Sequence, residues 1–319
     1  MGIEDIKDPI ERFVSFINER EAIRQRRNAG WPSKEWTQER ILKQYRFTNI
    51  NRENDKVSQH YQKTVRNRYK EQDIVLPATV LYRWFNRPET CDHFFNQPDF
   101  ANRSVFDLYI DYGDHSILTD CLSHISTPHV TGAYLIPSKP GFPKGEGVLQ
   151  YFHQWCKKPW KNMWDQWLHK EPPVTLQEVY EWTKSDGLGT FMRAQIVADL
   201  KYLPFLRKAE DWWTFAAPGP GSKKGLNAVY WRSMNATWKD AEWLEWLTKL
   251  NSTISPKLDE INITRLHNQD LQNCLCEFSK FEKVRLGIGR PRQVYHAPDA
   301  DNNPNARKES GPVNSTEST

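Results

Sequence analysis

The sequence lacks a nucleotide-binding P-loop. Such a loop has two glycines with four residues between them, and the second glycine is followed by Lys and then Ser or Thr. The nearest candidate is GPGSKKG at residues 219–225, but there both lysines precede Gly225 and Leu226 follows it. No other stretch restores the pattern, so this Gly- and Lys-rich segment needs another explanation.

Three further absences bound the class of protein. No apolar run reaches the ~18 residues of a membrane-spanning helix, and the acidic N-terminal segment MGIEDIKDPIERF differs from a signal peptide. We therefore expect a soluble, intracellular protein without a membrane partner. The five cysteines include no CxxC pair, which argues against a disulfide framework and against a zinc site. We expect no metal and no bound cofactor.

Aromatic residues, by contrast, are abundant, with 14 tryptophans in a chain of net charge +4. Several alternate with basic residues, as in CKKPWKNMWDQWLHK at 156–170. This pattern is typical of a Trp-rich helical core whose basic side chains reach solvent. It is also typical of a surface that stacks bases and holds phosphates. The sequence alone favours the core.

Helical periodicity dominates the chain. Apolar residues recur at i, i+3, i+4 and i+7 in the stretches 10–17, 243–250 and 271–278. Thr175 and Glu178 form the pattern of a capping box at a helix start. Strand-like runs are few, so we predict a mostly α fold with long irregular loops.

Composition sets the expected domain limits. Residues 132–147 are rich in Pro and Gly, which predicts a long loop between helices. Residues 296–319 have no apolar periodicity, which predicts a disordered tail. We therefore expect a single helical catalytic domain over residues 1–295.

Polar and charged residues cluster in YRFTNINRENDKVSQ at 45–59. If a helix begins near Asn51, Arg52 and Asp55 share one of its faces. The simpler interpretation is a solvated face with local ion pairs. The alternative is a site that binds an anion and orients a polar ligand, to which Asn49 would contribute. The pattern alone favours the solvated face.

SDGLGTFMRAQIVADLKY at 185–202 follows a capped helix and has the form of a helix-hairpin-helix. In that motif the turn glycines, here Gly187 and Gly189, let backbone amides at a helix N-terminus approach a DNA phosphate. Thr190 and Arg193 would lie in the first turn of the second helix. The alternative is an ordinary pair of helices joined by a glycine turn.

NQDLQNCLCEFSKFEKVRLG at 268–287 has a polar face opposite its apolar one. That face includes Asp270, Asn273 and Glu277, and a normal amphipathic helix is enough to explain it. Carboxylates at this spacing could also bind an amine and remove its proton. Cys276 could serve as a nucleophile, although a small buried filler is the simpler role.

Together and in this order, these stretches resemble the DNA thymine-hypermodification enzymes of bacteriophages. The resemblance also rests on TGAYLIP at 131–137 and on GPGSKKG, and it covers about residues 40–290. It points to the alpha-glutamyl/putrescinyl thymine pyrophosphorylases, or amino acid:DNA transferases, whose fold is similar to that of helix-hairpin-helix DNA glycosylases. A related helical domain is named after the 5-hydroxymethyl-deoxyuridine (5-hmdU) DNA kinases. The resemblance implies a phage protein that works in the host cytoplasm.

The resemblance implies a transferase reaction on DNA. A P-loop 5-hmdU DNA kinase first phosphorylates or pyrophosphorylates a hydroxymethyl group on uracil. The helical enzyme then displaces that leaving group with an amine co-substrate, such as an amino acid or a polyamine. The target base would be flipped out of the duplex. The implied partners are double-stranded DNA carrying modified thymine and the upstream P-loop kinase.

The resemblance also suggests roles for the clustered residues. Glu277, or else Asp55, would act as the base toward the amine, and Cys276 would add transiently to the ring. The residues expected to read the uracil edge are Asn49, Gln272 and Asn273. The residues expected to hold substrate or (pyro)phosphate are Arg46, Arg52, Lys223, Lys224, Lys280, Gly219, Gly221 and Gly225. The residues expected to bind DNA are Gly187, Gly189, Thr190 and Arg193.

Three alternative functions stay open at this point. The first is a kinase-associated helical module that binds modified DNA and leaves phosphorylation to a partner. The second is a glycosylase that excises the modified base and leaves abasic sites. The third is a structural helical protein with a basic face, which would bind DNA without regard to its modification.

Overall fold

The computed structural model describes residues 2–96, 103–133 and 135–289. Within these ranges all regular secondary structure is helical and no strand forms, which confirms a mostly α fold. None of the helices there combines the length and the apolarity that a membrane span requires. The helices are α1 (Pro9–Asn28), α2 (Arg40–Gln44), α3 (Lys56–Tyr61), α4 (Asn67–Tyr69), α5 (Val75–Phe85), α6 (Pro88–Phe95), α7 (Val105–Tyr112), α8 (His115–Ser123), α9 (Lys144–Cys156), α10 (Trp160–Leu168), α11 (Leu176–Trp182), α12 (Thr190–Leu200), α13 (Pro220–Val229), α14 (Asp240–Glu260) and α15 (Asn268–Arg285). Short 3-10 turns lie at Ile3–Asp5, Ser33–Glu35, Arg52–Asn54 and Leu206–Lys208, and a π-helical turn lies at Gln62–Arg66.

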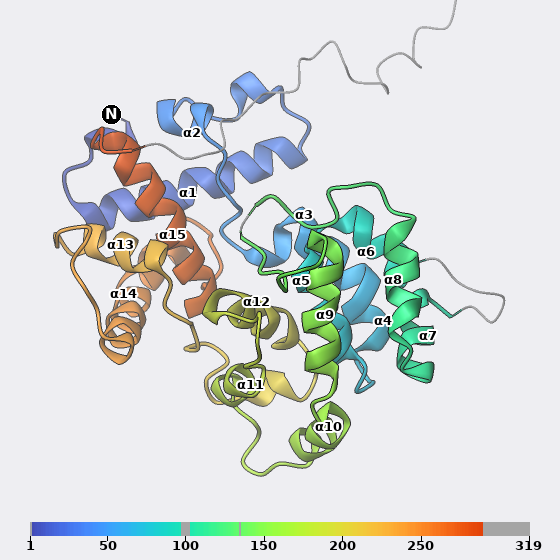
Figure 1. Ribbon diagram of the computed structural model, residues 1–319. Helices are drawn as coiled ribbons and strands as arrows, with labels where there is room; N and C mark the ends of the chain where they lie inside the picture. The colour runs from blue at the N-terminus through green and yellow to red at the C-terminus, as the bar shows by residue number, and fades with distance from the viewer. Residues whose placement is uncertain (1, 97–102, 134, 290–319) are drawn as a thin grey trace, which may run out of the picture.

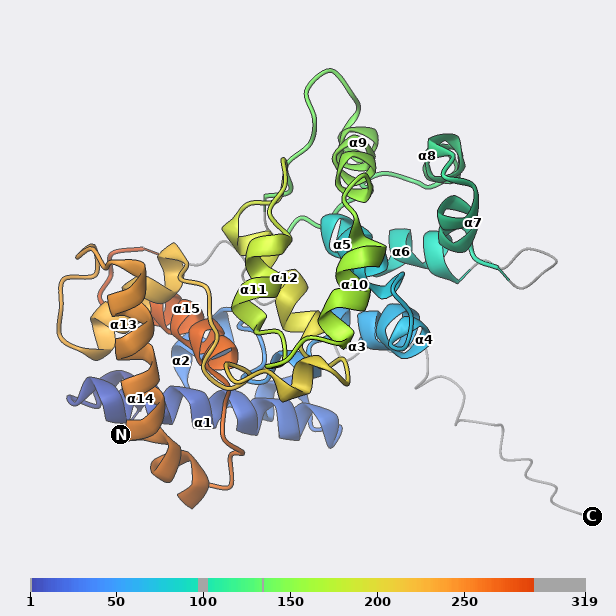
Figure 2. The same ribbon diagram turned by 90° about the horizontal axis from the view of Figure 1, so that it is seen from below.

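The helices pack around two hydrophobic cores (Figures 1 and 2). Residues from 3–50 and 216–281 share one core, so α1 lies beside α13, α14 and α15 although they are far apart in sequence. Residues from 61–217 build the other core. We call these parts the terminal lobe and the central lobe. A single domain over 1–295 stays a prediction, and the expected tail at 296–319 lies outside the described residues.

The periodic stretches of the sequence form the inner faces of α1, α14 and α15. The capping box at the start of α11 is confirmed, because Thr175 Oγ1 accepts from the N–H of Glu178 (3.1 Å) and Glu178 Oε2 accepts from that of Thr175 (2.9 Å). The expected loop at 132–147 is irregular in its described part until α9 begins. The apolar residues of α15 are fully buried: Leu271, Cys274, Leu275 and Phe278.

The alternating Trp and basic residues at 156–170 belong to the central core. Three tryptophans of α10 are buried there: Trp160, Trp164 and Trp167. Lys161 extends past this core with its ammonium group 5.2 Å from the ring centroid of Trp160. The core interpretation of this stretch is therefore confirmed.

The segment 45–59 folds differently from the expectation. Asn51 Oδ1 accepts from the N–H of Glu53 (2.8 Å) and caps only a short 3-10 turn. The regular helix α3 starts after Asp55. Arg52 and Asp55 therefore do not lie on a shared face of one continuous helix, and the prediction of a helix from Asn51 is wrong.

The stretch GPGSKKG forms the first turns of helix α13 and not an irregular loop. Pro220 occupies the first helical position, where its missing N–H leaves no hydrogen bond unmade. Ser222 Oγ accepts from the N–H of Gly219 (3.1 Å) and stabilises the helix start. Pro220 directly after Gly219, together with Ser222 three residues after that glycine, is therefore a helix-start signal here.

Glycines of this stretch bring α13 against α15. A Cβ atom on Gly225 would lie 2.0 Å from the carbonyl oxygen of Leu275. A Cβ atom on Gly221 would lie 2.4 Å from Sγ of Cys276. At position 225 the close atom belongs to the backbone, so only glycine permits the two helices to approach this closely, whereas at position 221 the Cys276 side chain would have to move.

Charged side chains join the two lobes. Asp199 on α12 accepts hydrogen bonds from Arg83 on α5 and from Nη2 of Arg52 (3.0 Å). The backbone N–H of Arg52 donates to Oδ1 of Asp270 on α15 (3.1 Å). Arg52 thus contacts one buried carboxylate in each lobe. We call these four residues the interlobe junction.

Trp231 follows the C-terminal end of α13 in the left-handed backbone region, with φ of 54°. Glycine adopts this conformation without steric cost, whereas a bulky residue there is strained. Trp231 is 75% exposed, so its replacement removes little packing. We expect Trp231→Gly to leave the free energy of unfolding unchanged or to raise it by up to about 1 kcal/mol. Urea unfolding tests this, and a loss of stability would contradict it.

We expect His153 to make the stability of the central lobe depend on pH. Its side chain is buried, stacks on His115 with ring centroids 3.6 Å apart, and contacts the hydroxyl of Tyr109 through Nδ1 (3.2 Å). Burial, and secondly the neighbouring His115, lower the pKa of His153 to about 3. Its Nε2 atom has no hydrogen-bond partner among the described residues, so a proton there would be buried without an acceptor.

The lowered pKa of His153 determines how the free energy of unfolding changes with pH. The unfolded chain binds a proton at this histidine below pH ~6.5, whereas the folded chain does not until about pH 3. The contribution of His153 is therefore complete above pH ~6.5 and is lost as the pH falls toward 3. We expect His153→Gln to flatten the decrease of unfolding free energy between pH 7 and 4, measured by urea unfolding. Equal slopes for both proteins would contradict the assignment.

Candidate nucleic-acid interface

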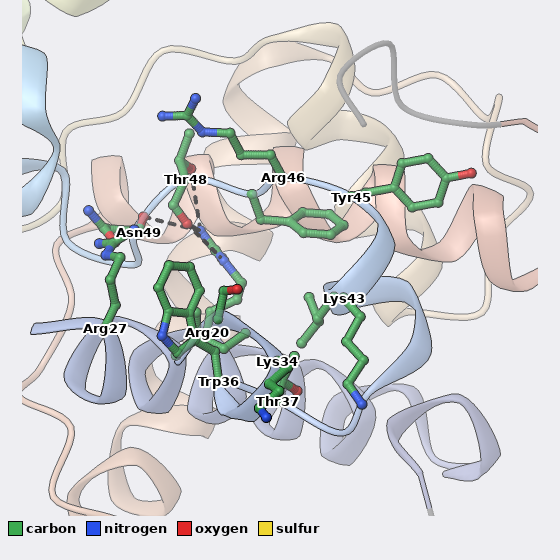
Figure 3. Close-up of a pocket in the computed structure, with 14 residues that line it drawn as sticks. Arg20, Arg27, Lys34, Trp36, Thr37, Lys43, Tyr45, Arg46, Thr48 and Asn49 are labelled. Carbon is green, nitrogen blue, oxygen red and sulfur yellow. Dashed lines mark hydrogen bonds between the residues drawn. The ribbon is translucent and has the colours of Figure 1, made fainter. Parts of the chain in front are cut away.

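A pocket of about 280 Å³ opens in the terminal lobe, between the second half of α1 and the segment 33–49 (Figure 3). Among the described residues that line it, none carries a carboxylate. Its cationic side chains are Arg20, Arg27, Lys34, Lys43 and Arg46. Its aromatic side chains are Trp36, Tyr45 and Phe47. We call it the cationic pocket.

Local hydrogen bonds hold one wall of the cationic pocket against α1. Arg26 Nη1 donates to the carbonyl of Trp36 (2.5 Å) and pairs with Glu19 (2.9 Å). The indole Nε1 of Trp36 donates to the carbonyl of Trp31 (2.7 Å). The ring of Trp36 is half-buried, and it has a fixed position in the wall because both the backbone carbonyl and the indole N–H of Trp36 are hydrogen-bonded.

Arg20 supplies the buried positive charge of the cationic pocket. Its side chain is buried, and its Nε and Nη2 atoms donate to the carbonyl of Thr48 (3.1 and 2.5 Å), with a further bond from Nη2 to the carbonyl of Asn49 (3.1 Å). These bonds, drawn in Figure 3, fix the segment after α2 to α1. The Nη1 atom is buried and has no hydrogen-bond partner among the described residues. A buried donor without a partner is uncommon in a folded protein.

The outer cations of the cationic pocket form no ion pair with a carboxylate in the part of the chain that the structure describes. Lys34 and Arg46 are exposed and make no ion pair or hydrogen bond there. Arg27 Nη2 donates to Oδ1 of Asn49 (3.3 Å), and Lys43 donates to a glutamine side chain. Their positive charge is therefore available to an anionic ligand.

Two of the predicted site residues, Arg46 and Asn49, line the cationic pocket, and others support it from behind. Asn273 Nδ2 on α15 donates to Oγ1 of Thr48 (3.1 Å). Asp55 Oδ1 accepts from the backbone N–H and from Nδ2 of Asn49 (3.2 and 3.0 Å). Segments 45–59 and 268–287 thus meet at the pocket, as the sequence alone could not establish.

The two predicted carboxylates, Asp55 and Glu277, are close enough for their charges to interact. Burial raises the pKa of Asp55, and the charge of Glu277 adds to this, while the hydrogen bonds from Asn49 and the charges of Arg52 and Arg20 act in the opposite direction. Glu277 is buried on α15, and its Oε1 accepts from Nζ of Lys280 (2.7 Å). Neither carboxylate lines the pocket. Asp55 contacts the lining residue Asn49 from outside the pocket.

The remaining predicted residues of α13 and α15 are not in the cationic pocket. Burial raises the pKa of Cys276, which keeps its thiol protonated and suits a filler better than a nucleophile. Lys223 pairs with Asp240 (2.7 Å), whereas Lys224 makes no ion pair with the described residues. Gln272 lies near the start of α13, with Nε2 3.8 Å from a Cβ placed on Gly219.

The predicted DNA-binding hairpin is α11, a turn and α12. Gly187 has φ of 74°, so its conformation favours glycine. Gly189 begins α12 with open space where a Cβ would be, and Thr190 is exposed beside it. Arg193 is buried instead, and its guanidinium lies 4.0 Å from the ring centroid of Tyr180. Arg193 therefore holds the two helices together.

A second hollow of about 10 Å³ lies at the interlobe junction. It has room for no more than about one water molecule. Burial lowers the pKa of Lys201 there to about 8, against the opposing charge of Asp270. No group of three metal-ligating side chains occurs among the described residues. The cationic pocket is therefore the larger of the two hollows and the one able to take a ligand.

Sequence reasoning missed most of the cationic pocket. Arg20, Arg27, Trp36 and Phe47 were not singled out, although EREAIRQRRN and the following WPSKEW hold the same mixture of basic and aromatic residues as 156–170. The signal was therefore present. It could not be separated from the core pattern of α10 without knowing which side chains are exposed.

Comparison with known proteins identifies the family of the chain. The family described as "5-hmdU DNA kinase, helical domain" matches residues 8–288. A protein named 5-hmdU DNA kinase from Bacillus phage SP10 is 40% identical in an alignment of 234 residues, and the alignment covers 68% of this chain. The chain spans about a third of that relative, 35% of its length. No solved structure shows a significant match.

These matches overturn the resemblance drawn from the motifs. Short motifs of low specificity, in the same order as in the pyrophosphorylases, pointed to enzymes that transfer an amine. Both matches instead carry the name of a kinase. The expectation of amine transfer to a (pyro)phosphorylated base is therefore wrong. The family match includes the segments that build the cationic pocket, since it extends from residue 8 to residue 288. The chain belongs to the family of the 5-hmdU DNA kinase helical domain.

Proposed function

We propose that this chain is the DNA-binding module for phosphorylation of 5-hydroxymethyl-deoxyuridine in DNA. The name of the SP10 relative supports this substrate class, and the family match supports the module. The given sequence has no P-loop, so the proposal assigns nucleotide binding and phosphoryl transfer to a P-loop kinase unit outside it. The module would hold the modified DNA while the kinase unit transfers the terminal phosphoryl group of a nucleoside triphosphate to the hydroxymethyl oxygen and releases the diphosphate.

The observation that carries the proposal is the cationic pocket. Five cationic side chains and no carboxylate among its described lining residues create a local positive field. Phosphates of DNA are the matching ligands, because each contact with Lys or Arg releases condensed counterions. Exposed Arg46 and Lys34 are placed to make such contacts.

We propose a supporting role for the predicted carboxylates. Asp55 holds the side chain and the backbone of Asn49. Burial, and to a lesser extent the charge of Glu277, raise the pKa of Asp55. Asn273, on the same helix as Glu277, donates a hydrogen bond to Thr48. In this proposal these residues set the shape of the pocket wall and do not act on the substrate.

We also propose that the hairpin formed by α11 and α12 is a second phosphate contact, of the helix-hairpin-helix type. Open space at Gly189 lets a backbone approach closely, and the N–H groups at the start of α12 favour an anion. Thr190→Glu should then weaken binding equally for all DNA sequences, measured by fluorescence anisotropy. Unchanged affinity would remove the hairpin from the interface.

The proposed function predicts a large effect of charge reversal in the cationic pocket. The double variant Arg27→Glu/Arg46→Glu should raise the Kd for a 5-hmdU duplex at least about 10-fold, because two phosphate contacts are replaced by repulsion. The slope of log Kd against log salt should fall by about 1.8, that is about 0.9 for each contact. Fluorescence anisotropy with a labelled duplex measures both quantities.

A matched control variant shows whether a loss of DNA affinity comes from the pocket residues or only from the change in net charge. Lys63 and Lys161 are exposed side chains outside the pocket, and their double replacement by Glu changes the net charge by the same amount. We expect this control to keep most of the affinity. Equal losses in both double variants would contradict the assignment of DNA binding to the cationic pocket. Release of a free base would instead indicate a glycosylase.

A further inference from the structure

We propose that the cationic pocket binds the phosphoryl group that the reaction adds to the base, so that the module holds phosphorylated DNA more tightly than DNA carrying 5-hmdU. This inference rests on the proposed function and names a further ligand of the same site, the product. The transfer replaces the hydroxyl proton of 5-hmdU by a phosphoryl group, so the ligand is a phosphomonoester on duplex DNA. Three observations carry the inference: the charge of the lining, the buried guanidinium of Arg20, and the size of the pocket.

The charge of the pocket lining favours the product over the substrate. Five cationic side chains line the pocket, and none of its described lining residues carries a carboxylate. A phosphomonoester carries about −1.5 to −2 charges at pH 7 and has three strong acceptor oxygens. The hydroxymethyl group of the substrate is neutral. The positive field of the pocket therefore attracts the product more strongly, beyond the attraction for the phosphodiester backbone that both duplexes share.

Lys34 and Arg46 are the lining side chains most available to the added charge. Both are exposed, and neither makes an ion pair or a hydrogen bond with the described residues. Lys34 precedes α2 and Arg46 follows it, and both are drawn among the pocket residues in Figure 3. Phosphoryl oxygens would accept hydrogen bonds from these two side chains without the loss of an existing one.

Arg20 adds a buried charge to the lining. Its side chain is buried, and its hydrogen bonds go to uncharged acceptors, namely the carbonyls of Thr48 and Asn49 and the hydroxyl of Thr48. The charge of Asp55 interacts with that of Arg20, but the two form no ion pair in the described part of the chain. Arginines are rarely buried without a charged partner. A buried guanidinium that lines a pocket and has no ion pair is suited to an anionic ligand.

The pocket has room for a phosphoryl group, and such a group is accessible on paired DNA. The volume of about 280 Å³ corresponds to roughly nine water molecules at ~30 Å³ each. The 5-substituent of the pyrimidine lies at the major-groove edge of the base pair, where thymine carries its methyl group. The major groove is ~12 Å wide, so the long side chains of Lys34 and Arg46 have room to reach the phosphoryl group while the base stays paired.

Anisotropy measurements on three labelled duplexes test the inference. The duplexes differ at one position, which carries thymidine, 5-hmdU or synthetic 5-phosphomethyl-deoxyuridine. We expect the intact chain to bind the phosphorylated duplex at least about 10-fold more tightly than the 5-hmdU duplex, the contribution of one charge-assisted hydrogen bond. This preference should decrease from about pH 7.5 to about pH 5.5, because the second pKa of a phosphomonoester is ~6. The thymidine duplex is the reference for titration of the protein itself.

Two double variants assign the preference to the pocket. Lys34→Ala/Arg46→Ala removes two exposed side chains without described bonds, so it should preserve the fold, which circular dichroism checks. The ratio of Kd for the 5-hmdU duplex to Kd for the phosphorylated duplex should fall toward one. Lys63→Ala/Lys161→Ala removes the same charge from exposed positions outside the pocket and should leave this ratio unchanged.

The outcomes separate this inference from the proposed function. Failure of the intact chain to bind any of the three duplexes would overturn the proposed function and the inference together. Tighter binding of 5-hmdU than of thymidine, with no further gain from the phosphoryl group, would overturn the inference alone. A gain that persists in Lys34→Ala/Arg46→Ala, or that does not change with pH, would also overturn it.

Discussion

Replacement of Asp199 by alanine is expected to lower the free energy of unfolding by about 3–5 kcal/mol. Asp199 is fully buried, and it is bonded to Arg83, which is 4% exposed, and to Arg52, which is 15% exposed. Asp199→Ala removes the negative charge that neutralises the guanidinium groups of Arg83 and Arg52, which have little contact with water. Loss of one partner of a buried ion pair costs more than the pair itself contributes.

Urea unfolding of the purified chain measures this effect. The exposed pair between Arg40 and Glu4 (2.7 Å) provides the control, since Arg40 is 64% exposed. Arg40→Ala should change the free energy of unfolding by less than about 1 kcal/mol. If Asp199→Ala and Arg40→Ala had equally small effects, the interlobe junction would not stabilise the fold as described.

Replacement of Gly225 by alanine is expected to destabilise the chain by about 3 kcal/mol, at the upper end of the usual cost of overpacking. Glycine in a helix interior normally costs about 1 kcal/mol relative to alanine, so an ordinary helical glycine would gain stability from this change. Here the new Cβ would lie 2.0 Å from the carbonyl oxygen of Leu275, a backbone atom that cannot move alone. Helix α13 would have to shift away from α15.

The test is whether Gly225→Ala raises or lowers the free energy of unfolding, because helix propensity predicts a rise and packing against Leu275 predicts a fall. Gly132→Ala is the control, since a Cβ at Gly132 would meet no atom within 4 Å and its φ is not positive. We expect it to leave the urea midpoint nearly unchanged. A Gly225→Ala protein as stable as the wild type would contradict the close packing of α13 on α15.

The sequence predicted the helical fold because its strongest signals are local. The apolar period of 271–278 and the capping box at Thr175 need only neighbouring residues to act, and both are confirmed. The packing role of Gly225 in GPGSKKG was not predicted, because this glycine serves a contact with Leu275, fifty residues further along the chain. Packing of that kind leaves no trace in the local sequence.

The candidate site was predictable only in part, for the same reason. Arg46 and Asn49 were singled out, since the density of polar residues around them is visible in the sequence. Arg20 was not, because an arginine on a helix gives no sign that Thr48 and Asn49 will cover it. Asn273 reaches the pocket only through the association of α15 with the N-terminal segment.

The most direct test of the proposed function compares two duplexes that differ in a single hydroxyl group. Kd is measured by anisotropy for a duplex with one 5-hmdU and for the same duplex with thymidine, with the wild type and with Arg27→Glu/Arg46→Glu. The proposal predicts that the wild type binds the 5-hmdU duplex at least about 5-fold more tightly than the thymidine duplex, since one hydrogen bond contributes ~1 kcal/mol. It also predicts that the variant binds the 5-hmdU duplex at least about 10-fold more weakly than the wild type does. Equal affinity for both duplexes, unaffected by the variant, would contradict it.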